Sequence, residues 1–467
     1  MPFLLPAIAA SASTLRKLVP LSLLCAASLA HAASYSDVFS QAVSGGKPSI
    51  TGTATDAAGN SYVVGGFTHA GGMLSGSGLS LTPIGAQDGF VAKLAPSGNV
   101  LWAHDIGGSG TTTSLASVSL DPSGNVVVGG SFSGGNLSYP GLSRTSTANT
   151  SYDGVVIKFD GNGNLLWSQD FGGASASTLF SWLATDAAGG IELAGEFEYG
   201  NTTKPALTKQ SAHGYDSFAM KLDTNGNLVW ARDIGGSAAT TNSNSIAVDP
   251  SQNVYISGSF SSGSLTTPSV SKIGTNDAYV IKYDSNGNFQ WARNYGGSGV
   301  SATAASVAVD ALGDVALGGY FHGGAMTTPA LPMVLSTDAY DAFAIKLNNA
   351  GTLQWARRFG GAASSSTFGF GIALDGSGNM VLGGTFNATI SNPALTLLGS
   401  SDSFAVELNS VGTTVWTMNM GTAGYNDAVG INGGFDADGT RTLLFSGIIY
   451  NNAMTTWEAV VFTQLVP

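Results

Sequence analysis

The sequence predicts an all-β protein: a seven-bladed β-propeller whose blades are four-stranded antiparallel sheets. This prediction rests on two phrases that recur in register along the chain and on an unusual composition. Of the 467 residues, 65 are glycine and only 10% are charged, whereas globular chains have roughly 7% glycine and about a quarter charged residues. Because the hydrophobic share of 43% is ample for a core, the surface must be polar but largely uncharged.

The first repeated phrase ends in a tryptophan. An aspartate lies 14 residues before each of these tryptophans, and the copies follow one another at intervals of 61 to 65 residues. The tryptophans are Trp102, Trp167, Trp230, Trp291, Trp355 and Trp416. A half-copy without tryptophan occupies 458–465. A fixed period of this kind indicates one supersecondary unit per repeat.

The second phrase is D-x-x-G-N, followed by an apolar run and Gly-Gly-x-Phe. Its seven copies begin at Asp56, Asp121, Asp186, Asp249, Asp310, Asp375 and Asp436. Around Asp249, four short segments between Gly and Asn turns are predicted as strands, at 245–248, 254–260, 278–283 and 289–294. Short strands without a helical period indicate an antiparallel meander. The remaining length, such as 68–87, is expected to connect the second strand to the third.

The first strand of each unit is expected to lie nearest the axis of the ring. Small residues such as Ser245 and Ala247 alternate there with larger ones such as Ile246 and Val248. Both faces are therefore small or apolar, as packing between converging blades requires. Radial repetition of this kind leaves only short sheet edges.

The two ends of the chain predict how the ring closes. The last copy ends after its third strand, at Leu465. Near the N-terminus, 37–41 leads to Gly45-Gly46, much as the phrase around Trp102 leads to Gly107-Gly108. The N-terminal segment is therefore expected to supply the outer strand of the last blade.

The first 32 residues have the features of an export signal. Arg16 and Lys17 precede an apolar run at 18–29, and Ala30-His31-Ala32 fits a cleavage site. The cysteine Cys25 lies inside this segment and is the chain's only one. We therefore expect a signal peptide at 1–32, a single propeller domain at 33–467, and a secreted, cell-surface or periplasmic protein. No later stretch is apolar over the roughly 20 residues that a membrane helix needs.

Two motifs give a family resemblance. Asp277-Ala-Tyr-Val-Ile-Lys282 and the G-N-x-x-W-A-R-x-x-G-G phrase at 287–297 resemble the seven-bladed beta-propeller repeat (SBBP) family of secreted bacterial proteins. The resemblance extends over nearly the whole chain after residue 32, although Glu407 replaces the repeated lysine in the sixth copy. It implies a propeller and export, and it implies no particular activity.

Residues that repeat in every unit are interpreted as structural. The tryptophans could form a carbohydrate-stacking ring, but a residue in fixed register on each outer strand is expected to dock neighbouring blades. The repeated lysines should pack their stems and make cation–π contacts; they are Lys93, Lys158, Lys221, Lys282 and Lys346. His104 stands where other copies have arginine, so an exposed edge position is expected for it.

Metal and cofactor motifs are weak. Hairpins such as Asp284-x-Asn286-x-Asn288 resemble the start of a calcium loop, but each offers one carboxylate and sits where turn residues are expected. No His pair has metal-ligand spacing and no phosphate-binding loop motif occurs. No metal and no cofactor are therefore expected.

Departures from the repeat give the candidate ligand site. Ser- and Thr-rich segments such as 172–180 and 235–244 should rim one mouth of the channel, and Trp182 replaces a small residue there. Trp182 could also simply plug the channel or fill space beside a wide blade. The unit-specific residues predicted to bind a ligand are Trp182, Phe180, Asn242, Asn244, Phe370, Tyr425 and Asn426. Such a rim suits a neutral glycan or a protein better than a charged ligand.

Two function classes remain at the level of sequence. The first is an exported binding or structural module, with an extracellular glycan or protein as its partner. The alternative is a propeller enzyme acting on a polysaccharide or a quinone-linked substrate. The net charge of −12 argues against nucleic acid as a partner, because nucleic-acid binding needs a positively charged surface. A monomer is expected.

Overall fold

The computed structural model describes residues 34–40, 49–69, 74–76, 79–143, 151–331, 339–361, 366–392, 394–419, 426–430, 442–451 and 456–465. The chain divides into two units, Met1–Ala32 and Ala33–Pro467, and the described residues all belong to the second. The predicted signal peptide at 1–32 lies outside them and stays a prediction. Within the described residues, no helix is long and apolar enough to cross a membrane.

Repeats one to three are antiparallel meanders of four strands. Repeat one consists of β2 (Ser49–Thr55), β3 (Ser61–Thr68), β6 (Gln87–Leu94) and β7 (Val100–Ile106). Repeat two consists of β8 (Thr112–Leu120), β9 (Val126–Ser133), β10 (Asp153–Phe159) and β11 (Leu165–Phe171). Repeat three consists of β12 (Ser177–Thr185), β13 (Ile191–Glu198), β16 (Asp216–Leu222) and β17 (Leu228–Ile234).

Repeats four to six have the same plan. Repeat four consists of β18 (Thr240–Val248), β19 (Val254–Ser261), β22 (Asn276–Tyr283) and β23 (Phe289–Tyr295). Repeat five consists of β24 (Ser301–Val309), β25 (Val315–His322), β28 (Asp341–Leu347) and β29 (Leu353–Gly361). Repeat six consists of β30 (Thr367–Leu374), β31 (Met380–Phe386), β34 (Asp402–Leu408) and β35 (Thr414–Asn419).

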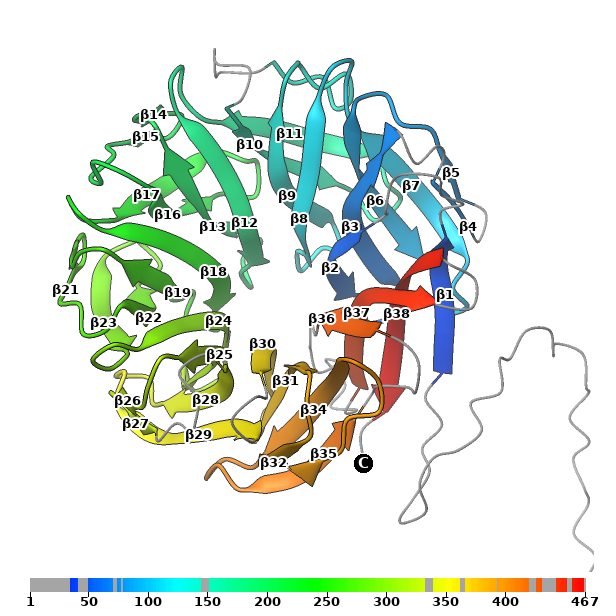
Figure 1. The fold of residues 1–467 in the computed structure, drawn as a ribbon. Coiled ribbons are helices and arrows are strands. Elements are labelled where there is room, and N and C mark those ends of the chain that lie inside the picture. The colour runs from blue at the N-terminus through cyan, green and yellow to red at the C-terminus, as the bar shows by residue number, and fades with distance from the viewer. Residues whose placement is uncertain are drawn as a thin grey trace, which may run out of the picture. The chain divides into compact units, whose positions relative to one another are not determined.

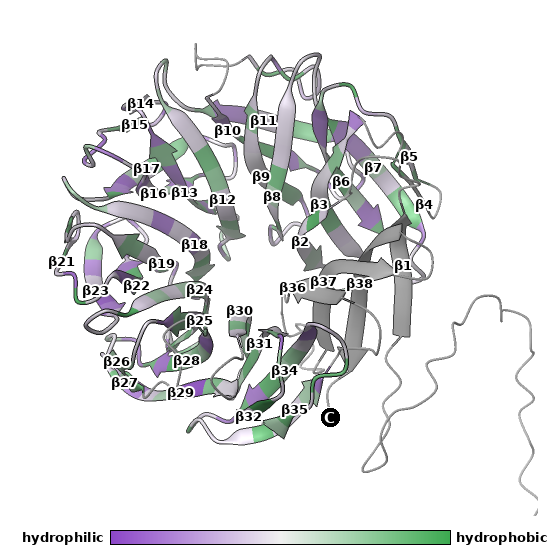
Figure 2. Ribbon diagram, viewed as in Figure 1, coloured by the Kyte–Doolittle hydropathy of each residue, from purple (hydrophilic) through white to green (hydrophobic). Residues whose placement is uncertain are grey.

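The sheets follow one another around a common axis, with the first strand of each repeat innermost (Figure 1). Third strands such as β16 and β28 are buried along their whole length, because neighbouring sheets cover both faces. The outer strand β23 begins with exposed residues and becomes more buried toward its end, and it mixes apolar and polar residues (Figure 2). The protein is thus all-β, with its apolar core between the sheets.

The inner strand of repeat four is longer than the sequence predicts. In repeat four the strand begins at Thr240 instead of 245, because a β-bulge at Asn244 interrupts the pairing with β19. The bulge adds one residue and breaks the two-residue alternation that marks a strand in sequence. The predicted mouth loop 235–244 is therefore half strand, and the same holds for 172–180, where β12 begins at Ser177.

Small residues let consecutive inner strands approach one another. The Ser117 hydroxyl on β8 accepts a hydrogen bond from the backbone N–H of Leu183 on β12 at 3.3 Å. A Cβ on Gly52 of β2 would lie 3.1 Å from the Ser117 Cα, closer than most Cβ contacts. The predicted small face of the inner strand therefore lies between repeats, as expected.

The long connections between second and third strands carry small hairpins. They are β4 (Leu74–Gly76) with β5 (Leu79–Leu81), β14 (Thr202–Thr203) with β15 (Ala206–Leu207), β20 (Leu265–Thr266) with β21 (Ser269–Val270), β26 (Met326–Thr327) with β27 (Ala330–Leu331), and β32 (Ile390–Asn392) with β33 (Ala394–Leu395). The connections of repeats two to five each bridge the glycine after the outer strand of the preceding repeat, as Thr267 of repeat four pairs with Gly235. The extra length of these repeats therefore covers the end of the outer strand of the preceding repeat.

The N-terminal strand pairs with the last strand of the chain. The final repeat contains β36 (Asn426–Gly430), β37 (Thr442–Asn451) and β38 (Thr456–Leu465), and β1 (Ser34–Ser40) lies antiparallel to β38. Their register joins Ser34 to Thr463 and Ser40 to Glu458. The inner strand β2 in turn contacts β37 and β38. Strand β1 thus occupies the fourth-strand position that the sequence assigns to it.

Candidate functional site

The repeated tryptophans join neighbouring repeats. The indole N–H of Trp230 donates to the carbonyl oxygen of Ser285, in a hairpin of the next repeat, at 3.1 Å. Gly287 in that hairpin has φ +74°, and a Cβ there would lie 2.6 Å from the Trp230 ring. Trp102, Trp167, Trp291 and Trp355 make the corresponding hydrogen bonds. The docking role predicted for these tryptophans is confirmed. Because their indole groups contact the next repeat, they do not form a ring of side chains that is free to stack on a carbohydrate.

The repeated lysines are more buried than the sequence suggests. The predicted cation–π contacts occur for Lys93 over Tyr62 and for Lys282 over Tyr255, at 4.9 and 5.0 Å from the ring centroids. Ion pairs with the turn aspartates occur as well: Lys158 Nζ lies 2.8 Å from Asp121 Oδ2. Lys93, Lys221 and Lys346 pair in the same way with Asp56, Asp186 and Asp310. The lysines therefore neutralise buried aspartates of their own repeat.

His104 differs from its expected edge position. Its ring lies nearly parallel to that of Phe159 in the next repeat, with centroids 5.0 Å apart, and its Nε2 is 2.6 Å from the carbonyl oxygen of Gly163. A histidine can replace arginine here because both side chains bond to the hairpin carbonyl, as Arg232 bonds to Gly287. His104 is a half-buried contact between repeats and not an exposed edge residue.

The hairpins that resemble calcium loops are closed by hydrogen bonds of their own. Asp284 Oδ1 accepts the backbone N–H groups of Asn286 and Asn288, and Oδ2 accepts the Asn288 amide at 2.9 Å. Desolvation acts to raise the pKa of the Asp284 carboxyl, but these hydrogen bonds and the charge of Arg232 together outweigh it, so the pKa is lowered. Among the described residues, no group of three His, Cys, Asp or Glu side chains could hold a metal ion.

We therefore expect calcium to leave the stability of the protein unchanged. A ligand that binds only the folded state raises the melting temperature by mass action. Melting curves in millimolar CaCl2 and in EDTA should coincide. A clear calcium-dependent rise in melting temperature would show that the hairpins bind the ion.

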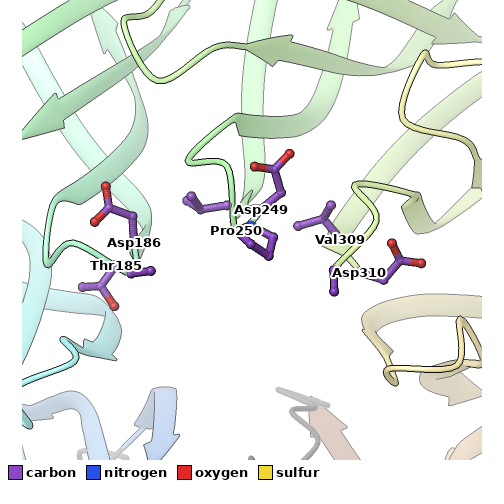
Figure 3. A pocket seen from close by; sticks show the side chains of 9 residues that line it. Thr185, Asp186, Asp249, Pro250, Val309 and Asp310 are labelled. Carbon is purple, nitrogen blue, oxygen red and sulfur yellow. The ribbon is translucent and has the colours of Figure 1, made fainter.

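One pocket lies where three inner strands turn into their second strands. It has a volume of about 310 Å³ and is lined by Thr185, Asp186, Ala187, Val248, Asp249, Pro250, Val309, Asp310 and Ala311. Figure 3 shows the carboxylates of Asp186, Asp249 and Asp310 turned away from the open space between the turns. Asp186 and Asp310 bond to lysines, and Asp249 accepts the Tyr255 hydroxyl. The pocket thus offers mainly methyl groups to a ligand.

The predicted site residues of repeat three are partly or wholly buried. Phe180 is 4% exposed and packs edge-on against Phe171 and Phe218, so its ring belongs to the core. Trp182 is half-buried and packs against the apolar cluster that repeats three and four share. That contact is the space-filling role that the sequence left open for Trp182.

The other predicted residues that the structure describes lie on three inner strands. Asn242 and Asn244 are half-buried on β18, and the Asn244 amide donates to the carbonyl oxygen of Ala304 on β24 at 3.1 Å. Phe370 is 40% exposed, at the bulge of β30. Asn426 is the first residue of β36, where it pairs with Tyr450, and Tyr425 lies outside the described residues.

Phe370 belongs to a cluster of five rings between repeats five and six. Phe368 and Phe370 are nearly parallel, with an interplanar angle of 5° and centroids 5.8 Å apart. Phe368 lies 5.1 Å from Tyr320 and 4.8 Å from Tyr340, and His322 lies 4.4 Å from Tyr340. The other four rings are half-buried, and Phe370 is exposed. We call these five residues the aromatic cluster.

The corresponding positions between repeats three and four are polar. Pairing registers align Tyr320 with Glu196 and Phe368 with Asn242. By the same registers, His322 corresponds to Glu198, Tyr340 to Tyr215 and Phe370 to Asn244. Four of these positions thus carry rings at one interface and carboxyl or amide groups at the other, whereas Tyr340 corresponds to another tyrosine.

Glu196 is a titratable group that the sequence analysis missed. Burial raises the pKa of its carboxyl to about 7, although a 3.0 Å hydrogen bond from the Ser243 N–H opposes the rise. In other repeats this position, before the phenylalanine of Gly-x-x-Phe-type phrases, holds Gly66, Ser131 or Ser259. A comparison of that single column across the repeats would have revealed both Glu196 and Tyr320.

Comparisons with known proteins agree with the repeat architecture. A family model described as Beta-propeller repeat matches residues 229–259. An uncharacterized WD repeat-containing protein, L264 of Acanthamoeba polyphaga mimivirus, is 24% identical over 369 residues, which are 64% of this chain. The match covers 26% of that protein, so this chain spans about a quarter of its relative's length.

Solved structures show only distant likeness. The polysaccharide lyase Uly1 is 8% identical with a TM-score of 0.49, over 89% of this chain and 90% of the lyase. A PL25 ulvan lyase is 11% identical with a TM-score of 0.44, over 93% and 96% of the two chains. Together, the repeat match, the WD-repeat relative and the all-β meanders support a β-propeller repeat protein.

Proposed function

We propose that the protein is an exported seven-bladed β-propeller, closed by β1, that binds a neutral glycan through the aromatic cluster. The observation that carries this proposal is the grouping of five rings from two repeats, none of them in a wholly buried side chain. Aromatic rings in a protein core are normally buried, whereas these five side chains are all partly or largely exposed. The corresponding interface between repeats three and four does not have this grouping of rings.

The chemistry of the cluster suits a sugar. The apolar C–H face of a pyranose packs on aromatic faces, and the nearly parallel rings of Phe368 and Phe370 offer such faces. The hydroxyls of Tyr320 and Tyr340 and the ring nitrogens of His322 can bond to sugar hydroxyls. No lysine or arginine contributes to these ring contacts, which favours an uncharged ligand.

The test measures binding of neutral oligosaccharides to the purified protein by calorimetry after a glycan screen. We expect Phe370→Ser to weaken the affinity about fivefold, because one aromatic contact contributes roughly 1 kcal/mol and a tenfold change corresponds to about 1.4 kcal/mol. Val229→Ser is the matched control, since Val229 is an exposed apolar residue on the outer strand β17. Unchanged binding in Phe370→Ser, together with loss of binding in Trp182→Ser, would move the site to repeat three.

The second candidate is a polysaccharide-active enzyme, and Glu196 is the observation that favours it. A carboxyl whose pKa is raised to about 7 can serve as a general acid at neutral pH. Glu198 lies two residues further along β13 and therefore on the same side of the strand. Release of reducing ends from a bound glycan, abolished by Glu196→Gln, would establish this function instead.

A further inference from the structure

Buried aspartates fasten the long connections to the sheets. Asp216, the first residue of β16, accepts backbone N–H bonds from Gln210 and Ser211, the latter at 3.2 Å. In repeat four, Asp277 accepts the corresponding N–H bonds from Ile273 and Gly274, at 2.6 and 2.7 Å. Asp88 and Asp402 hold the connections of repeats one and six in the same way. The connections of repeats one, three, four and six are thus each tied to their sheet through one carboxylate.

The residue beside this aspartate on the outer strand is a hydrogen-bond donor in repeats four to six. Asn294 donates to Asp277 Oδ2 at 2.7 Å, and Asn419 donates to Asp402 Oδ2 at 3.0 Å. In repeat five the donor is Arg358, 2.8 Å from Asp341. A donor at this place satisfies the carboxylate oxygen that faces the outer strand.

Repeats one and three place a second aspartate at the same position. Phe218 pairs with Asp233 just as Tyr279 pairs with Asn294, so Asp233 faces Asp216 where Asn294 faces Asp277. Asp105 faces Asp88 by the same register in repeat one. Asp105 Oδ1 and Asp233 Oδ2 are buried and accept no hydrogen bond within the described structure. Two carboxylates in such contact repel each other when both are ionised, so ionising the second one costs free energy.

Repeat two also has two aspartates, but a cation relieves their repulsion. Lys204 Nζ lies 2.7 Å from Asp170 Oδ1. Asp170 occupies the outer-strand position, and Asp153 begins the third strand. Among the described residues, the aspartate pairs without a lysine or arginine in an ion pair are therefore those of repeats one and three.

We propose that the carboxyl pairs Asp88–Asp105 and Asp216–Asp233 are pH-sensitive latches. In acid, one proton shared by each pair supplies the hydrogen bond that Asn294 supplies in repeat four, and the connection stays on its sheet. When that proton is lost, the two negative charges repel and the connection loosens. This inference does not depend on the identity of the ligand.

The electrostatics of the two pairs agree with this direction. Burial, with the charge and hydrogen bond of Asp88, raises the pKa of Asp105 to about 7. Burial raises the pKa of Asp233 and of Asp216, and the charge of Asp216 adds to the rise at Asp233. The other groups acting on the second pair are Lys209, which attracts Asp216, and Gln210 and Thr267, which bond to Asp233.

The direction of the pH dependence follows from the thermodynamic linkage between proton binding and closure of the connection. Because the folded-state pKa is raised, the folded protein holds a proton that the opened connection releases. Stability of the closed latch is therefore complete in acid and falls as the pH rises from about 4 to about 7.

Amide hydrogen exchange of the native protein tests the latches, with rates corrected for intrinsic pH dependence. Protection of the Ile84 and Gly85 amides in repeat one should fall between pH 5 and pH 8, by at most about tenfold per pH unit, and protection of the Gln210 and Ser211 amides in repeat three should fall in the same direction. Protection of Ile273 and Gly274 in repeat four should not change, which provides a control inside the same molecule. Equal pH dependence at the connections of these three repeats would overturn the proposal.

Two substitutions exchange, between repeats three and four, the outer-strand residue that faces the aspartate of the third strand. Asp233→Asn should make the amides of repeat three as insensitive to pH as those of repeat four. Asn294→Asp should give the amides of Ile273 and Gly274 the pH dependence of repeat three. If Asp233→Asn does not fold, Asn294→Asp alone decides the question, because absence of a new pH dependence there contradicts the latch.

Discussion

A chain that lacks β1 is expected to be less stable by about 3 kcal/mol or more and to aggregate. Six residues of β1 pair with β38, and each hydrogen bond of such a ladder contributes about 0.5–1.5 kcal/mol. Without β1, the edge of β38 presents unpaired N–H and C=O groups that can pair with another molecule. Urea denaturation and size-exclusion chromatography of a chain that starts after residue 46 measure both effects.

The matched control is a chain that starts at Ser34, which keeps β1 and removes only the residues before it. This control should match the full-length protein in its urea midpoint and stay monodisperse. A synthetic peptide of residues 34–46, added to the truncated chain, should restore the lost stability. If the truncated chain is as stable and as soluble as the control, β1 does not fasten the last repeat.

The repeat pattern allowed the strands to be predicted, because a packing demand that recurs in every sheet leaves the same residues at the same spacing. Trp230 and Gly287 illustrate this: one docks on the other, and both recur with the period of the chain. The bulge at Asn244 could not be predicted, because a single extra residue breaks the alternation on which strand prediction depends.

The candidate site was only partly predictable for a related reason. Phe370 stood out as a departure from the repeat, but its partners Tyr320 and Tyr340 lie 50 and 30 residues earlier in another repeat. Only the contact between repeats five and six brings these rings together. Likewise, each buried lysine and its aspartate are separated by about 35 residues, and only their common period relates them.

Lys221→Met is expected to destabilise the protein more than the same change at any other repeated lysine. Lys221 Nζ contacts both Asp186 and Glu192, and neither carboxylate side chain is exposed. Although burial opposes the charged ammonium, the two carboxylates raise the pKa of Lys221. Removing one partner of a buried ion pair costs about 3–5 kcal/mol, since it leaves the other charges uncompensated.

Lys93→Met is the matched control for this prediction, because Lys93 lies 3.7 Å from Asp56 in a more exposed pair. Its loss should cost about 1 kcal/mol or less. The cost of Lys221→Met should also shrink in acid: burial already raises the pKa of Glu192 to about 7, so protonation removes one of the two stranded charges. Urea midpoints of both variants at pH 5 and pH 8 test the prediction. Equal losses in the two variants at pH 8 would mean that the triad of Lys221, Asp186 and Glu192 adds no stability beyond that of an ordinary surface pair.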